Sequence, residues 1–311
     1  NRSPSSTATV SNPPATRVQQ VSISQFGFAQ PTNPIQESQN WQSGFLPGVY
    51  QGTYIDTKHT QIEKLIENIN NVRTSPEAQK GQLALLRKLN EEHRRARTTD
   101  PQLDARIQSF ELAYRMQMDA ADAFDIQREP ESVRKLYGEG TQSRQLLIAR
   151  RLVERGVRFV QLFHPDWDHH SRLTSWCTAR CRDTDQPSAA LVKDLKRRGL
   201  LEDTLVVWGG EFGRGVAGQG KWDSPEAGRD HHPRCFTMWM AGGGVKAGTT
   251  FGETDDFSYN VAKDPVHVHD LHATILHLMG IDHERFTYRH QGLDFRLTGV
   301  EPAKVVKGIV A

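Results

Sequence analysis

The chain has 311 residues, enough for one large domain or two small ones. Its 39 basic and 37 acidic side chains nearly cancel, so charge gives no reason to expect a nucleic acid or a membrane surface as partner. No apolar run approaches the roughly 18 residues of a transmembrane helix, so no membrane span is predicted. The chain begins with asparagine and shows no signal peptide, which leaves open a removed leader or a fragment.

The first 140 residues divide into two predicted segments. Residues 1–39 are rich in Ser, Thr, Pro, Asn and Gln without apolar periodicity, which is typical of a polar loop or of the edge of a larger, fragmented domain. Residues 40–140 are predicted to form a helical segment packed on the core. Within it, Ser75 and Pro76 are typical of a helix start, and Asp100 with Pro101 repeats the signal.

Residues 141–311 are predicted to form an α/β core that makes one domain with the helical segment. A helix over 141–156 leads into a strand at 157–163, and a second helix over 185–199 leads into a strand at 204–210. Strand, helix and strand at this spacing indicate a βαβ unit, so the two strands are expected to be parallel.

A third strand at 235–243 follows a Gly-rich, polar connection without a crossover helix. It is therefore expected to be antiparallel, with its amino end at the rim where the first two strands end. A last helix runs from Asp264 to Gly280, and its predicted buried face is Leu271, Ile275, Leu278 and Met279. Capping and packing explain the histidines near its start, His267, His269 and His272.

The three cysteines exclude a fully paired intrachain disulfide framework, because their number is odd. Cys177 and Cys181 are four residues apart, but no matching pair of ligands completes a structural zinc site. They are interpreted as loop thiols, with a local disulfide as the alternative.

Ligand-type side chains follow the first two core strands and precede the third. Asp168 and His170 come after the first strand, and Glu211 comes after the second. His231 lies just before the third strand. Sites in open α/β sheets form beyond the carboxyl ends of the parallel strands, so these segments are expected to converge. Because carboxylate and imidazole are typical ligands of zinc and similar ions, the sequence predicts a metal site made by Asp168, His170, Glu211 and His231.

Two arginines flank the predicted site. Arg214 and Arg229 could each hold a phosphate or sulfate through paired hydrogen bonds, and Arg214 is the candidate catalytic residue. Further ligand-type neighbours are Asp166, His169 and His232. The alternative is an ordinary surface loop, since 13 histidines cluster somewhere by chance and Asp-x-His is a common triplet.

Several long motifs resemble one bacterial family. They are "NWQSGFLPGVYQGTYI", "IARRLVERGVRFVQLFHPDWDHH", "DTLVVWGGEFGR", "GRDHHP", "FTMWMAGGGVKAGT" and "DPVHVHDLHATILHLMGIDHERFTYRHQGLDFRLT". They are similar to the secreted sulfatase-like proteins of domain-of-unknown-function family fifteen-oh-one, which resembles the alkaline phosphatase superfamily. The resemblance covers residue 40 to the end of the chain. One departure is Gly215, which stands where the family has threonine after Glu-Phe-Gly-Arg.

The resemblance implies an alkaline-phosphatase-like α/β fold, with a mostly parallel sheet flanked by helices and a helical insertion. The family's first strand and its Gly-Gly-x-Ser-His-x-Asp motif have no counterpart here, so the N-terminal part of the fold and the nucleophile are expected upstream. We therefore expect little turnover by this chain alone.

The function implied by the resemblance is metal-dependent hydrolysis of sulfate or phosphate esters, with divalent ions, zinc or calcium, as cofactors. The substrate would be a small-molecule or glycan ester. The alternative is a non-catalytic anion- or glycan-binding protein that keeps the fold. Family membership also implies a periplasmic or secreted location.

Overall fold

The computed structural model describes residues 20–24, 52–57, 59–65, 73–95, 121–210, 212–221 and 223–311. The chain forms two compact units. Unit 1 takes residues 1–24, 28–125 and 155–163, and unit 2 takes residues 25–27, 126–154 and 164–311. No helix in the described parts of the chain is long and apolar enough to cross a membrane.

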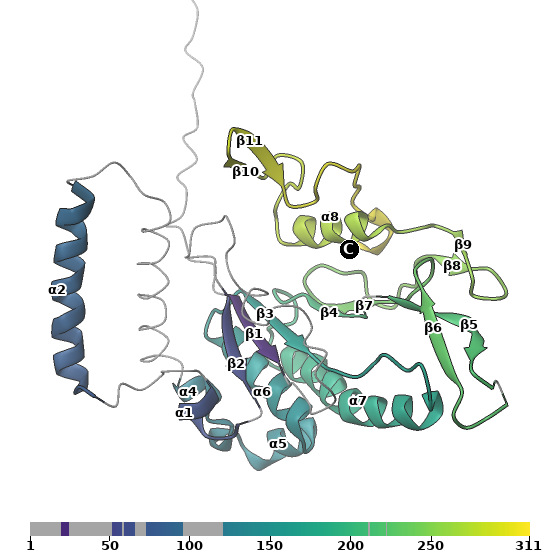
Figure 1. Cartoon of the computed structure of the whole chain (residues 1–311), viewed down its shortest axis with the longest axis horizontal. Helices are drawn as coiled ribbons and strands as arrows, with labels where there is room; N and C mark the ends of the chain where they lie inside the picture. Colours follow the sequence, from purple (N-terminus) through teal and green to yellow (C-terminus); the bar gives the residue numbers. More distant parts are fainter. Residues whose placement is uncertain are drawn as a thin grey trace, which may run out of the picture. The chain divides into compact units, whose positions relative to one another are not determined.

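Unit 1 contains a three-stranded parallel sheet (Figure 1). The central strand β1 (Gln20–Ser24) pairs with β2 (Thr53–Asp56) on one side and with β3 (Phe159–Phe163) on the other. β1 lies in the segment that was predicted to be a polar loop, and β3 agrees with the predicted strand at 157–163. Ile55 of β2 is fully buried.

The described helices of unit 1 are α1 (Ile62–Leu65), α2 (Pro76–Arg95) and α4 (Ala121–Phe124). The predicted start of α2 is confirmed, because the Ser75 hydroxyl oxygen accepts a hydrogen bond from the Ala78 amide at 3.2 Å. Its leucines remain accessible: Leu86 is 51% and Leu89 is 58% exposed.

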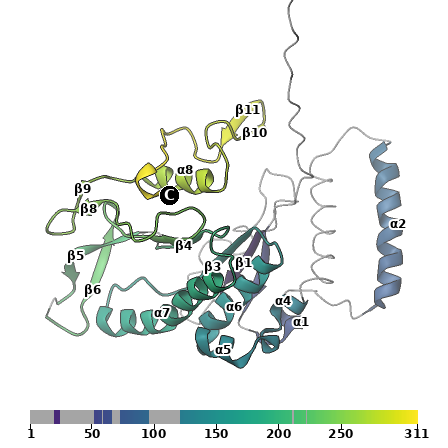
Figure 2. The same cartoon turned by 180° about the vertical axis from the view of Figure 1, so that it is seen from behind.

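The helices of unit 2 pack together, as Figures 1 and 2 show from opposite sides. They are the short 3-10 helix η3 (Ile126–Arg128), α5 (Glu131–Tyr137), α6 (Thr141–Glu154) and α7 (Leu173–Arg197). The apolar core of this layer includes the buried side chains of Val133, Leu147, Ile148, Ala190 and Leu195. The helix predicted at 141–156 is therefore confirmed as α6.

The helix predicted to start at Asp185 starts at Leu173 instead, and Pro187 lies inside it. The interpretation of Cys177 and Cys181 as loop thiols is therefore wrong, since both lie on consecutive turns of α7. Their sulfur atoms are 4.0 Å apart and form no disulfide.

A buried ionic network joins α6, α7 and Glu129, the residue that follows η3. Arg150 of α6 has a fully buried side chain, and its guanidinium contacts three carboxylates, those of Glu129, Glu154 and Asp194. The contacts to Glu129, at 2.6 Å, and Asp194, at 3.1 Å, are ion pairs without hydrogen-bond alignment. Tyr137 also donates a hydrogen bond to Asp194 at 3.2 Å. Further cations around these carboxylates are Arg151, Arg197 and Arg198.

Because of this network, the stability of unit 2 is expected to fall at acid pH. Burial alone would raise the pKa of Asp194, but hydrogen bonds from Arg197 and Arg198 and the charge of Arg150 lower it on balance. The pKa of Glu129 is likewise lowered by Arg150 and Arg151 against the effect of burial. The pKa of such a carboxyl is lower in the folded than in the unfolded protein. Its ionised form therefore stabilises the fold at pH values above the unfolded pKa, and this stabilisation is lost as the pH falls through the folded pKa.

We therefore expect the free energy of unfolding to fall between about pH 5 and pH 2, where such carboxyls become protonated. Urea titrations at pH 7 and pH 3, followed by tryptophan fluorescence, measure this change. Equal stability at the two pH values would show that the two carboxyls contribute nothing through their ionised forms.

The strands of unit 2 form separate antiparallel pairs. β4 (Val206–Trp208) pairs with β7 (Trp239–Ala241), and β5 (Gly213–Gln219) pairs with β6 (Gly228–His232). The third predicted strand is thus antiparallel to the second, as expected. Two further pairs are β8 (Glu253–Thr254) with β9 (Val261–Lys263), and β10 (Thr287–His290) with β11 (Leu293–Arg296).

The prediction of an alkaline-phosphatase-like, mostly parallel sheet is wrong. Within the described ranges, parallel pairing is confined to the three short strands of unit 1, and every strand pair of unit 2 is antiparallel. β3 and β4 were expected to be parallel neighbours, but β3 pairs with β1 and β4 pairs with β7. The sequence pattern predicts the order of strand, helix and strand along the chain. It does not determine which strands are hydrogen-bonded neighbours in a sheet.

The last helix, α8 (Val268–Leu278), starts four residues after the predicted start at Asp264, and His267 is its cap. The interpretation of the histidines near this start as capping residues agrees with His267. The His267 side chain accepts a hydrogen bond from the His269 amide, and Asp270 accepts one from the His267 amide at 3.1 Å. The predicted face is only partly correct: Leu271, Ile275 and Leu278 are half-buried and Met279 is exposed, whereas the fully buried side chains are Asp270, Ala273 and Thr274. Asp270 and Thr274 accept backbone hydrogen bonds from the C-terminal segment, which ends in the 3-10 helix η4 (Lys307–Ile309).

Candidate metal centre

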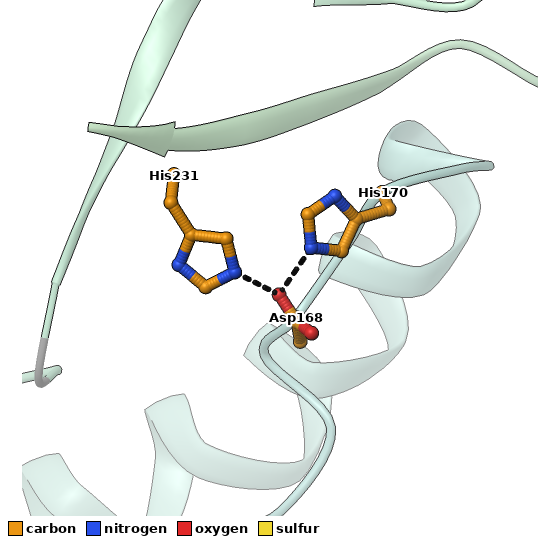
Figure 3. A group of neighbouring side chains, drawn as sticks. All are labelled: Asp168, His170 and His231. Carbon is orange, nitrogen blue, oxygen red and sulfur yellow. Dashed lines mark ion pairs between the residues drawn. The ribbon is translucent and has the colours of Figure 1, made fainter.

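Three of the four predicted ligands lie together in unit 2 (Figure 3). The Asp168 Oδ1 atom is 2.9 Å from His170 Nε2 and 3.0 Å from His231 Nε2. All three ligand atoms lie within 4.8 Å of one another, which is close enough to share one ion. Asp168 and His170 belong to the segment before α7, and His231 belongs to β6. The fourth predicted ligand, Glu211, lies outside the described residues.

The β5–β6 ribbon brings these two segments together. Arg214 on β5 is paired with His231 on β6, and a bulge separates that pair from the one between Gly218 and Arg229. The Arg229 amide donates a hydrogen bond to the His169 carbonyl at 2.9 Å. β6 therefore holds the segment that carries Asp168 and His170 through its backbone.

Gly228 permits the closest approach between the ribbon and this segment. A Cβ atom at this position would lie 2.0 Å from the carbonyl carbon of His170 and 2.4 Å from the Ser171 nitrogen. Both are backbone atoms, so the crowding could be relieved only by moving the chain. The absence of a side chain at Gly228 is thus a condition for the position of His170.

We expect Gly228→Ala to weaken binding of a divalent ion by about 10- to 100-fold, the range seen when support of a metal ligand is lost. Titration with zinc in the presence of a competing chelator measures this. Gly215→Ala is the matched control on β5, because its Cβ would approach the Asp230 carbonyl only to 3.7 Å. Equal losses in both variants would contradict a specific role for the close approach at Gly228.

Arg214 neutralises the carboxylate at the centre of the cluster. It donates to Asp168 Oδ1 at 2.5 Å, to the Trp167 carbonyl at 3.2 Å and to the Arg229 carbonyl at 3.4 Å. Burial alone would raise the pKa of Asp168, but the hydrogen bond and charge of Arg214, with His170 and His231, lower it on balance. Asp168 is therefore ionised at neutral pH and available as an anionic ligand.

A family model described as "Protein of unknown function (DUF1501)" matches residues 4–310. The chain belongs to this family. The family resemblance read from the sequence motifs is thus confirmed, and the description of DUF1501 names no activity. No curated protein and no solved structure matches the chain.

The remaining ligand-type neighbours of the DUF1501 chain do not join the cluster. His232 contacts the Tyr259 carbonyl at 2.6 Å through Nε2. His169 is buried, its pKa is lowered by burial and by the nearby arginines Arg214 and Arg180, and its Nε2 has no hydrogen-bond partner among the described residues. Arg229 donates to the Gly215 carbonyl at 3.0 Å. Among the described residues, only the three side chains of Figure 3 are therefore close enough to one another to share one ion.

Sequence reasoning missed Gln219, whose amide oxygen lies 2.6 Å from His170 Nδ1. It also missed the strand that carries Gln219, because the Gly-rich stretch after Glu211 was interpreted as a loop. The signal that could have found it is the pair of Gly-rich runs around a polar turn, which is typical of a bulged hairpin.

Proposed function

We propose that this DUF1501 protein is a metal-dependent hydrolase of phosphate or sulfate esters, whose ion is held by Asp168, His170 and His231. The observation that carries the proposal is the convergence of one carboxylate and two imidazoles, from two separate segments, within 4.8 Å. Exposed acidic groups often lie near one another without binding an ion. Here, in addition, the backbone of β6 and the close approach at Gly228 hold the two ligand segments together.

The donor set favours zinc over calcium. Zinc binds imidazole nitrogen and carboxylate oxygen, and catalytic zinc sites use three protein ligands and keep a position open. Calcium takes six to eight oxygen ligands, and two imidazoles do not suit it. The three side chains are between 38% and 60% exposed, so a small molecule can reach the open position. Glu211 is the proposed additional ligand.

Arg214 supports the proposed ester chemistry as an anion contact. Its guanidinium has five N–H groups, and three of them donate to protein acceptors in this structure. We propose that its remaining donors face the phosphate or sulfate of the substrate, which planar guanidinium groups hold well. A divalent ion beside it would supply Lewis-acid polarisation of the ester oxygen.

The proposed substrate is a small-molecule or glycan ester, and the proposed location is the periplasm or the cell exterior. Both follow from the family resemblance. Cell fractionation tests the location, and recovery of the protein in the cytosol would contradict it.

Hydrolysis assays with metal-depleted protein test the proposed function. We expect release of nitrophenol from para-nitrophenyl phosphate or para-nitrophenyl sulfate on addition of zinc, and loss of this activity in His231→Ala. Asp230→Ala is the control, since this exposed neighbour is not one of the three ligands.

Two outcomes would contradict the proposal. Zinc binding without hydrolysis of either ester would favour the non-catalytic anion- or glycan-binding protein. Hydrolysis that persists in metal-depleted protein and in His231→Ala would show that the cluster is not the reacting centre.

A further inference from the structure

The His170 ring has a different partner at each nitrogen. Its Nε2 atom faces Asp168 Oδ1 at 2.9 Å, on the side of the ligand cluster. Its Nδ1 atom faces the Gln219 amide oxygen at 2.6 Å. An amide oxygen can only accept a hydrogen bond, so this contact requires a proton on Nδ1. The ionised Asp168 carboxylate is an acceptor too, so in the absence of a metal ion it competes for a proton on Nε2.

Gln219 is held in place by the same strand pairing that positions the His170 backbone. It lies opposite Gly228 in the β5–β6 register, and Gly228 is the residue that packs against the His170 carbonyl. One pair of facing residues thus sets both the backbone and the ring of His170. The other acceptor on this side is Asp230, whose Oδ1 is 3.8 Å from Nδ1 and whose side chain is 71% exposed.

We propose that Gln219 is a positioning residue that favours a proton on Nδ1 of His170 and so leaves Nε2 as the atom that binds a divalent ion. The consequence for metal affinity rests on the proposed function, whereas the effect of Gln219 on the ring proton does not. Outer-shell acceptors of this kind orient metal-binding imidazoles, and their loss typically costs about 10- to 100-fold in metal affinity.

Nitrogen-15 NMR of the imidazoles in metal-free Asp168→Ala protein, at a pH where the rings are neutral, tests the position of the ring proton, because this background removes the competing acceptor at Nε2. We expect His170 in this background to carry its proton on Nδ1. Adding Gln219→Leu removes the remaining acceptor at similar size, and we expect the proton to move to Nε2 in a large share of molecules. Adding Gln219→Glu keeps an acceptor oxygen and is expected to retain the proton on Nδ1. Asp230→Asn is the control for the more distant acceptor.

Zinc affinity of wild type and of the three variants Gln219→Leu, Gln219→Glu and Asp230→Asn, all with Asp168 intact, provides the second measurement. We expect Gln219→Leu to raise the Kd by about 10- to 100-fold, with Gln219→Glu and Asp230→Asn close to wild type. An Nε2–H tautomer in the Asp168→Ala background, or an unchanged tautomer when Gln219→Leu is added to it, would overturn the role of Gln219. If the tautomers are as expected but wild type binds no zinc, the proposed function and the ligand part of this inference are overturned. The positioning of the His170 ring by Gln219 would remain supported.

Discussion

Replacing Arg150 by methionine is expected to lower the free energy of unfolding by about 3–5 kcal/mol, the cost typical of breaking a buried ion pair by removal of one partner. The Arg150 side chain is fully buried and contacts Glu129, Glu154 and Asp194. Asp194 is also fully buried and Glu129 is 8% exposed, so both would lose a counter-charge where water cannot replace it. Methionine fills much of the same volume, which limits the contribution of a cavity.

Urea unfolding of wild type and Arg150→Met at pH 7 measures this difference. Arg197→Met is the matched control, because Arg197 also pairs with Asp194 but its own side chain is 57% exposed. An exposed pair of this kind typically contributes about 0–1 kcal/mol. Similar small losses in both variants would show that burial of Arg150 does not make the network stabilising.

Replacing Asp168 by asparagine is expected to weaken zinc binding by more than about 100-fold, beyond the range for loss of an outer-shell partner. Asparagine has nearly the same shape but lacks the negative charge, and Asp168 Oδ1 is the atom on which both imidazoles converge. The variant also leaves Arg214, with its positive charge, beside the site without its carboxylate partner. Repulsion between Arg214 and the ion adds to the loss.

Competition of zinc with a chromophoric chelator measures the affinity of this variant. Asp230→Asn is the control, because Asp230 is a carboxylate of the same strand as His231 and lies on the other side of the His170 ring. An Asp168→Asn protein that binds zinc as tightly as wild type would remove Asp168 from the ligand set.

The sequence named three ligand-type residues that lie together, but the reason it gave for their convergence was wrong. The prediction placed them beyond the ends of two parallel strands, β3 and β4, which do not pair with each other. In the structure His231 lies within β6, and β6 contacts the segment of Asp168 and His170 through the Arg229 amide and the His169 carbonyl. The prediction of β7 as antiparallel to β4 was correct. The ribbon that completes the site was not predicted, because its glycines are typical of a loop and the bulge at Arg214 hides any period-2 alternation.

The pairing of strands and the contents of the core were less predictable. The Asp185 and Pro187 pattern resembles a helix start, yet α7 passes through it, since packing against α5 and α6 outweighs the local preference. Arg150 would be placed on the surface by hydropathy alone, and only its three carboxylate partners explain its burial. Such partners come from distant segments and leave no local pattern.

The most direct test of a metal centre at Asp168, His170 and His231 is the metal content of the purified protein by elemental mass spectrometry, after exposure to zinc and removal of the excess. Wild type is predicted to retain about one zinc per chain, and a His170→Ala/His231→Ala variant to retain almost none. Glu211→Ala, measured beside them, shows whether Glu211 is a further ligand. Equal zinc content in wild type and the double variant, whether high or near zero, would contradict the site.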